Sequence, residues 1–235
     1  MHNIPDILKA SYDNADVAFA LGHHNFPDFR KNLERHGLVT LPRIDENPAR
    51  PKFRIGHVYE YALNMTVNLH MPREGTAAAV RHLFGYMEGC ATHRLNALDD
   101  ETRHAIMFDG MQGRYVEESS IKTQAEYGRF VDYPWLYFNA EILDRSDQRK
   151  AKPLIWVLPP AHQMVGREAM LVDGPEVNTV LACQHFTERL RKINIDPDVV
   201  EPVRSINMIN VTDLLSEVDR RLNVRLHARR LRGDM

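Results

Sequence analysis

Apolar side chains recur at helical spacing in two short segments near the start of the chain. The first covers residues 17–21 and stops at Gly22, and a glycine in that place is typical of a helix end that needs a left-handed backbone. The second begins at Pro27, which suits the first turn of a helix, and stops at Gly37. Two short helices joined by a glycine-containing turn are the outline of a helix-turn-helix.

A loop rich in proline and arginine follows, and two further helices are predicted behind it. We expect a short strand at each end of residues 41–53, which is the layout of a winged helix-turn-helix. Residues 56–69 and 76–87 each carry apolar side chains on one face at helical spacing. These helices would supply a core for the first two, because short helices bury too little surface to be stable alone. A lead-in over residues 4–12 is also expected to be helical.

The second half of the chain has the composition of strands. Aromatic, valine, isoleucine and threonine residues are concentrated over residues 121–143, and further strands are predicted over residues 153–158 and 163–172. The apolar run over residues 153–158 is continuous, which predicts a strand buried on both faces. Because short turns separate these strands, we expect mostly antiparallel pairing.

Two amphipathic helices and a short strand complete the predicted elements. A helix over residues 176–193 is expected to turn inward Val177, Val180, Leu181, Phe186, Leu190 and Ile193. A strand is expected over residues 206–211, and a last helix over residues 212–231 with Thr212 as its N-cap. The expected inward residues of that helix are Leu214, Leu215, Val218, Leu222 and Leu226.

These elements predict an α+β chain with two domains. The first, residues 1–110, would be a helical winged helix-turn-helix domain. The second, residues 111–235, would hold a mostly antiparallel sheet with flanking helices. The change from helical to strand-rich sequence falls near Gly110.

Composition narrows the class of protein. Apolar residues make up 43% of the 235 residues and charged residues 26%, which is ordinary for a globular protein. No stretch approaches the roughly 20 apolar residues that a membrane span needs, and no secretory signal pattern opens the sequence. Two cysteines are too few for a disulfide framework, so a reducing compartment and a cytoplasmic location are expected.

Charge is uneven along a chain whose net charge is −2. Basic residues outnumber acidic ones over residues 28–54, and residues 220–232 carry six arginines with no acid between them. Two local basic patches on a near-neutral chain suit contact with phosphates at defined places. The alternative is that both patches are solvated faces, which is the common role of such charge runs.

The stretch Lys31-Asn-Leu-Glu-Arg-His-Gly-Leu38 resembles regulators of the MerR family. These have a recognition helix, a Glu-x-x-Gly-Leu step and a wing rich in proline and arginine, and the order and approximate spacing hold over about residues 14–85. Matching positions are Asp16-Val-Ala18 and Gly22 in the first helix and turn, Glu34, Gly37 and Leu38 in the step, and Pro42, Arg43, Phe53 and Arg54 in the wing.

The resemblance has departures. The family's Arg-Tyr-Tyr run is replaced by Lys31-Asn32-Leu33, and the wing is longer and carries Asp45 and Glu46. The long coiled-coil dimerisation helix of the family is not obvious. Other winged-helix or excisionase-like proteins match the same short motifs.

The resemblance implies a dimeric transcriptional regulator that binds double-stranded DNA, with the second domain serving dimerisation or a small-molecule effector. Residues expected to face the major groove are Asn25, Asp28, Arg30 and Lys31. Those expected to bind phosphates or enter the minor groove are Arg35, Arg43, Arg50, Lys52 and Arg54. The alternative is an ordinary helical hairpin with solvated charges.

Few residues elsewhere suggest chemistry. Cys90 and His93 with Cys183 and His185 have the ligand types of a zinc site, but their spacing is weak and both cysteines suit a helix core. We therefore expect no metal. Because phosphate-binding loops and nucleophile elbows are absent from the sequence, we also expect no cofactor and no enzymatic activity.

Aromatic residues on the expected strands offer a different function. Tyr133, Trp135 and Tyr137 alternate along one strand, and Trp156 lies on another. They are either core, a dimer interface or the lining of a ligand pocket. The alternative functions are therefore a small-molecule-binding protein or enzyme that uses this sheet, or a phage or mobile-element protein that binds DNA for excision or assembly.

Overall fold

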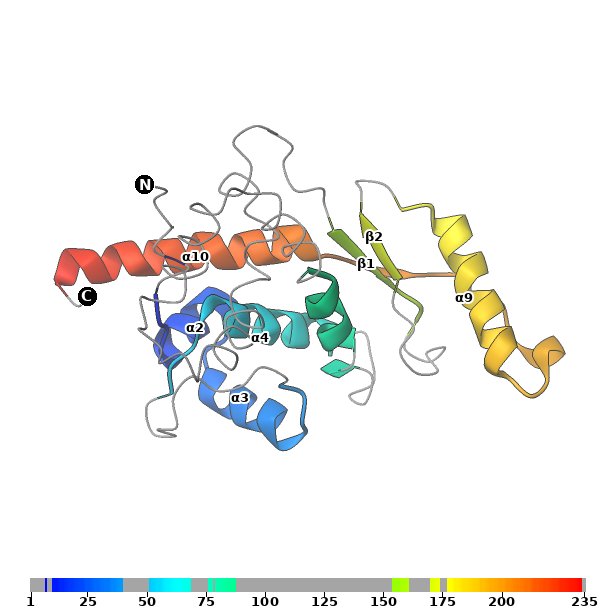
Figure 1. The fold of residues 1–235 in the computed structure, drawn as a ribbon, viewed down its shortest axis with the longest axis horizontal. Helices are drawn as coiled ribbons and strands as arrows, with labels where there is room; N and C mark the ends of the chain where they lie inside the picture. The colour runs from blue at the N-terminus through cyan, green and yellow to red at the C-terminus, as the bar shows by residue number, and fades with distance from the viewer. Residues whose placement is uncertain are drawn as a thin grey trace, which may run out of the picture.

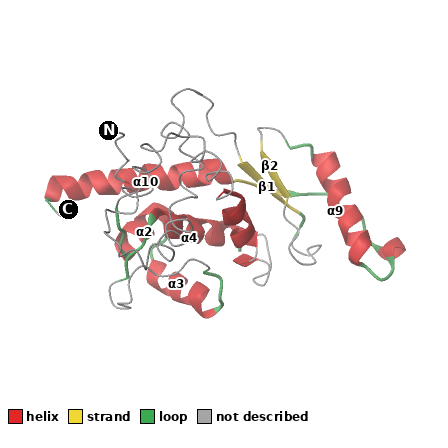
Figure 2. Ribbon diagram, viewed as in Figure 1, coloured by secondary structure: helices red, strands yellow, loops and turns green. Residues whose placement is uncertain are grey.

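The computed structural model describes residue 7 and residues 10–39, 51–68, 76–77, 79–87, 154–160, 170–173 and 177–233. This part of the chain is mostly helical with one small antiparallel sheet, so the α+β class is confirmed (Figures 1 and 2). Its elements are α2 (Asn14–Leu21), α3 (Phe26–Arg35), α4 (Ile55–Val67), β1 (Leu154–Leu158), β2 (Met170–Asp173), α9 (Thr179–Ile193), the 3₁₀ helix η4 (Pro197–Val199), β3 (Asn207–Asn210) and α10 (Val211–Arg232).

The end of α2 at Gly22 and the start and end of α3 near Pro27 and Gly37 lie where the sequence predicts them, and α2 begins earlier, at Asn14. Asp13 caps α2, and its Oδ1 accepts hydrogen bonds of 2.9 Å from the backbone N–H groups of Ala15 and Asp16. Gly22 ends α2 with a φ of 63°, in the left-handed region that glycine adopts without strain. Pro27 lies in the first turn of α3, and the chain leaves that helix through Gly37.

Two further helices confirm their predictions, whereas the lead-in does not reach its expected end. α4 and the helical residues 76–77 and 79–87 cover the two segments predicted at helical spacing. Tyr12, expected to close a helix over residues 4–12, instead forms an isolated antiparallel bridge with Phe53. Both backbone hydrogen bonds of the bridge are 2.8 Å long. The backbone at Tyr12 is therefore extended where the last helical turn is predicted. Phe53, at the far end of the predicted wing, pairs with this lead-in segment.

The sheet has the order β2-β1-β3, and both pairings are antiparallel as expected. Leu154, Trp156 and Leu158 join the main core, while Val157 joins a smaller core beneath α9. The prediction that this strand is buried on both faces is confirmed. The strand predicted over residues 163–172 is described from Met170 onward. The strands expected over residues 121–143 lie outside the described residues.

α10 is the element around which the main core forms. It runs along α2 and α4 and reaches β1 (Figure 1). Its buried side chains are Val211, Leu215, Val218, Leu222 and Leu226, and burying each of them contributes about 1.5–3 kcal/mol. The last four belong to the predicted stripe and are confirmed, whereas its remaining member, Leu214, is only partly buried. The core thus unites residues on both sides of Gly110, since α10 comes from the expected second domain and packs within the first.

The predicted start of α10 is wrong by two residues. Asn210 is the N-cap, and its Oδ1 accepts a hydrogen bond of 3.1 Å from the backbone N–H of Asp213. The Thr212 hydroxyl oxygen instead accepts a hydrogen bond of 2.8 Å from the backbone N–H of Leu154. Thr212 therefore joins α10 to β1 rather than capping the helix.

The inward face predicted for α9 is only partly correct. Ala182, Phe186 and Leu190 are buried, whereas Val180, Leu181 and Ile193 are exposed. The buried residues follow each other at intervals of four, which makes a narrow stripe that a three-stranded sheet can cover. Val180 lies on the opposite side of the helix, and Ile193 lies beyond Leu190 at the far end. Among the helices described, none is long and apolar enough to cross a bilayer.

Candidate functional site

The solvent-facing side of α3 is the surface that the sequence predicts as a site. Phe26 and Leu33 lie on the opposite side of the helix and are buried. The Phe26 ring makes edge contacts with Phe53 at 5.8 Å and Tyr61 at 5.0 Å between ring centroids, which fixes α3 on α4. The exposed residues of α3 follow helical spacing on one face and are Asp28, Lys31, Asn32 and Arg35.

Arg30 does not belong to that face, so its expected contact with the major groove is wrong. Its side chain is only 6% exposed, and its Nη1 lies 3.3 Å from Oε1 of Glu34. The guanidinium carbon lies 5.9 Å from the centroid of the Phe53 ring. Arg30 therefore connects α3 with the chain that leads into α4, and a bound phosphate could not reach it without displacing these contacts.

Arg54 is also buried, which contradicts its expected role as a phosphate contact. It is the N-cap residue of α4, and its backbone N–H donates a hydrogen bond of 3.2 Å to Nδ1 of His57. Arg54 stands where the chain enters a helix that is enclosed by the core. Every residue of α4 from Ile55 to Asn64 is buried.

Of the remaining predicted DNA-binding residues, some are described by the structure and two are not. Asn25 is exposed and its Nδ2 donates a hydrogen bond of 2.8 Å to Oδ2 of Asp28, so these two lie together at the start of α3. Lys52 is partly exposed beside the Phe53 bridge. Arg43 and Arg50 lie outside the described residues. The structure therefore brings Asn25, Asp28, Lys31 and Arg35 to one exposed helix and separates Arg30 and Arg54 from them.

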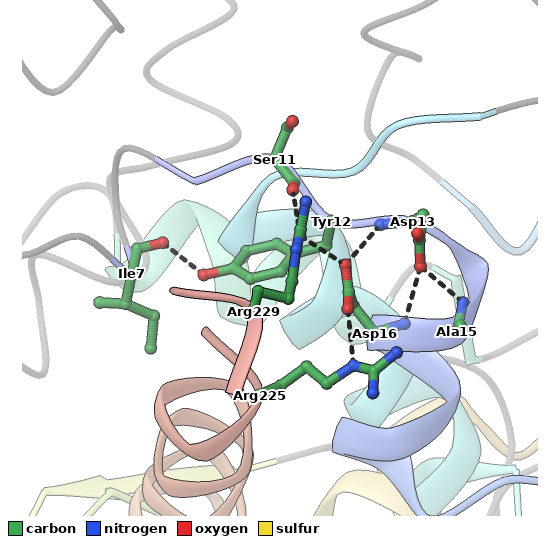
Figure 3. A network of polar contacts seen from close by, with 8 residues as sticks. All are labelled: Ile7, Ser11, Tyr12, Asp13, Ala15, Asp16, Arg225 and Arg229. Atoms are coloured by element: carbon green, nitrogen blue, oxygen red, sulfur yellow. Dashed lines mark hydrogen bonds and ion pairs between the residues drawn. The ribbon is translucent and has the colours of Figure 1, made fainter. Parts of the chain in front are cut away.

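A buried ion-pair cluster holds α2 against α10 (Figure 3). Asp16 is 1% exposed, and its Oδ1 lies 2.9 Å from Nε of Arg225 while its Oδ2 lies 2.9 Å from Nη1 of Arg229. The backbone N–H of Asp13 donates a third hydrogen bond, of 3.1 Å, to the same carboxylate. Arg229 also donates to the backbone carbonyl of Ser11 at 3.4 Å. Asp16 is thus paired on both oxygens, which a buried carboxylate requires.

The cluster assigns a structural role to part of the arginine-rich segment. Arg225 and Arg229 are one helical turn apart, so both reach the same carboxylate. Arg221 donates from Nε to Glu217 at 2.7 Å and from Nη1 to the backbone carbonyl of Ala20 at 3.3 Å. The sequence signal was the Asp13-x-x-Asp16 spacing of a capping box, but nothing in it indicated a partner more than 200 residues away.

A second polar contact joins α4 to α10. The Tyr59 hydroxyl donates a hydrogen bond of 2.6 Å to Oδ1 of Asp219. Burial raises the pKa of Asp219 to about 7, and the hydrogen bond from Tyr59 opposes that rise. Burial also raises the pKa of Tyr59 well above its usual value, and the charge of Asp219 adds to the effect. Because both groups prefer to keep their protons, the pair is a neutral structural contact over much of the acidic range.

The other predicted sites receive no support from the described residues. Cys183 is a free, partly exposed thiol, and Cys90 and His93 lie outside the described part. Within that part no cluster could hold a metal. Trp156 is fully buried in the main core, so it is a core residue rather than the wall of an open pocket. Tyr133, Trp135 and Tyr137 are outside the described ranges.

The chain was compared with protein families, with curated proteins and with solved structures. None of the three comparisons found a match.

Proposed function

We propose that this chain is a DNA-binding regulator whose α3 helix docks in the major groove of a duplex. The observation that carries the proposal is the solvent-facing side of α3, which presents Lys31, Asn32 and Arg35 at helical spacing while the other side is locked into the core. An α-helix fits the major groove, where side chains such as these read base edges and bind phosphates.

The chemistry of the exposed residues suits such a contact. Lys31 and Arg35 carry the positive charge that phosphates attract, and an arginine can bind guanine through two hydrogen bonds. Asn32, which in the sequence is only a departure from the family pattern, lies beside them and can pair with adenine through its amide. Asp28 opposes phosphate contact at the start of the helix, so we assign docking to the later turns.

The support beneath α3 is suited to recognition because it is rigid. α2 is capped at both ends and joined to α10 by the Asp16 cluster, and Arg30 and the Phe26 ring fix α3 against its neighbours. In this proposal α2 and α3 with the following wing form a winged helix-turn-helix, and the wing ends at the Tyr12–Phe53 bridge. Two copies would bind paired half-sites as a homodimer. The same docking would also serve a mobile-element protein that acts in excision or assembly.

The test is fluorescence anisotropy with a mixed-sequence duplex over a series of salt concentrations. The wild type is expected to bind with an affinity that falls as salt rises. K31A/R35A should lower the affinity, and it should reduce the slope of log K against log salt by about 0.9 for each phosphate that the variant no longer neutralises. The matched control is R191A/K192A, which removes two exposed cations at the end of α9. Salt-independent binding, or an equal loss in both double variants, would contradict the proposal.

A further inference from the structure

A groove lies on the side of α2 that faces away from the main core. It is bounded by α2, by the turn between α2 and α3, and by α10, and its volume is about 730 Å³. This is the size of pockets that hold small organic molecules. The groove lies apart from the exposed face of α3 that the DNA-binding proposal uses, because the residues it takes from α3 are limited to Pro27 at the first turn.

The wall of the groove is largely apolar. Ala18, Phe19, Pro27 and Val224 line it. Phe19 is 46% exposed and Val224 is 51% exposed, although both are large apolar side chains on well-formed helices. A ligand that covers these two side chains would remove apolar surface from water, at about 25 cal/mol for each square ångström buried.

The edge of the groove is positively charged. Arg220 and Arg221 line it together with His23 and His24, and the described lining residues include no carboxylate. Glu217, outside the lining, accepts 2.7 Å hydrogen bonds from Nε of each arginine and so holds both guanidinium groups in place. The single negative charge of Glu217 neutralises only one of the two arginines, so a net positive charge remains beside the apolar wall.

We propose that this groove binds an amphipathic organic anion: a small molecule with an apolar body and a carboxylate. The apolar body lies against Phe19 and Val224, and the carboxylate faces Arg220 and Arg221. The charge at the edge selects an anion over a neutral or cationic ligand of the same shape. This site does not depend on the proposed DNA binding, and its test uses no nucleic acid.

The test is titration of the full chain with 6-hydroxy-2-naphthoate, followed by calorimetry and by the fluorescence of the probe. 6-Hydroxy-2-naphthamide, which keeps the ring and the hydroxyl but lacks the charge, is expected to bind about tenfold more weakly. Saturable binding of the acid with a clear preference over the amide supports the site. No saturable binding of the acid, or equal binding of acid and amide, overturns it.

Variants locate the binding. V224E places a like charge in the groove and should weaken binding of the acid about tenfold or more. V180E is its matched control, because Val180 is a similarly exposed valine on α9, away from the groove (Figure 1). An equal loss in V224E and V180E would overturn the assignment.

Discussion

Replacing Asp16 by asparagine tests how strongly the ion-pair cluster stabilises the fold. The substitution keeps the shape of the side chain, and the amide oxygen can still accept from the backbone N–H of Asp13. It removes the negative charge that faces Arg225 and Arg229, which are 29% and 21% exposed, and it places an amide NH2 opposite one of these two donors. The change therefore isolates the two ion pairs from the helix cap.

The expected loss of stability is about 2–4 kcal/mol. Removing one partner of a fully buried ion pair costs about 3–5 kcal/mol, and the value here is reduced because both arginines keep some contact with water. A loss of this size is a large fraction of the roughly 5–15 kcal/mol by which folded proteins are stable. The urea midpoint of D16N should fall clearly below that of the wild type, with the m-value unchanged.

The matched control is D28N, at an exposed aspartate on α3 whose hydrogen bond is to the neighbouring Asn25. It should change the free energy of unfolding by no more than about 0.5 kcal/mol. Both variants lose one negative charge, so the comparison removes any general effect of net charge. A loss below about 1 kcal/mol in D16N would refute the reasoning, because the two ion pairs would then contribute no more than surface pairs do.

Two further substitutions test single contacts. G22A should lower the thermal midpoint more than G37A. Both glycines have a left-handed φ near 63°, but at Gly22 the new Cβ would lie 2.9 Å from Nη1 of Arg221, which would then move away from the backbone carbonyl of Ala20. Equal losses would show that this movement has no cost. Because the pKa of Asp219 is about 7 when folded and near 3.8 when unfolded, the folded state holds an extra proton between these values, and stability should fall as pH rises from about 4 to 7. D219N should reduce this pH dependence in urea midpoints measured at pH 4.5 and 7.5, and an unchanged slope would assign it to another group.

Local backbone requirements account for the predictions that are confirmed. Gly22 and Gly37 mark places where the chain must adopt a positive φ, and Pro27 marks a first helical turn, so each can be identified from its neighbours alone. The apolar run of β1 likewise reports burial on both faces. None of these inferences needs information about distant parts of the chain.

The errors concern contacts between distant segments. Arg30 is expected to face the major groove because it lies on the predicted recognition helix, but it is buried and its guanidinium packs on Phe53. Val180 is expected inside because it is apolar, but it is exposed on the side of α9 opposite the buried Ala182 and Phe186. The partners of Asp16 are also remote. Which charges become buried depends on tertiary packing, which helical periodicity does not report.

The position of α10 in the sequence has a consequence for synthesis of the protein. The contacts that fix α2 and α4 connect residues 209 and 160 positions apart, from Asp16 to Arg225 and from Tyr59 to Asp219. A ribosome makes α10 long after it has made the helices that α10 covers. The apolar faces of α2 and α4 are therefore exposed on the nascent chain until α10 emerges, and during this time chaperones and proteases can bind them.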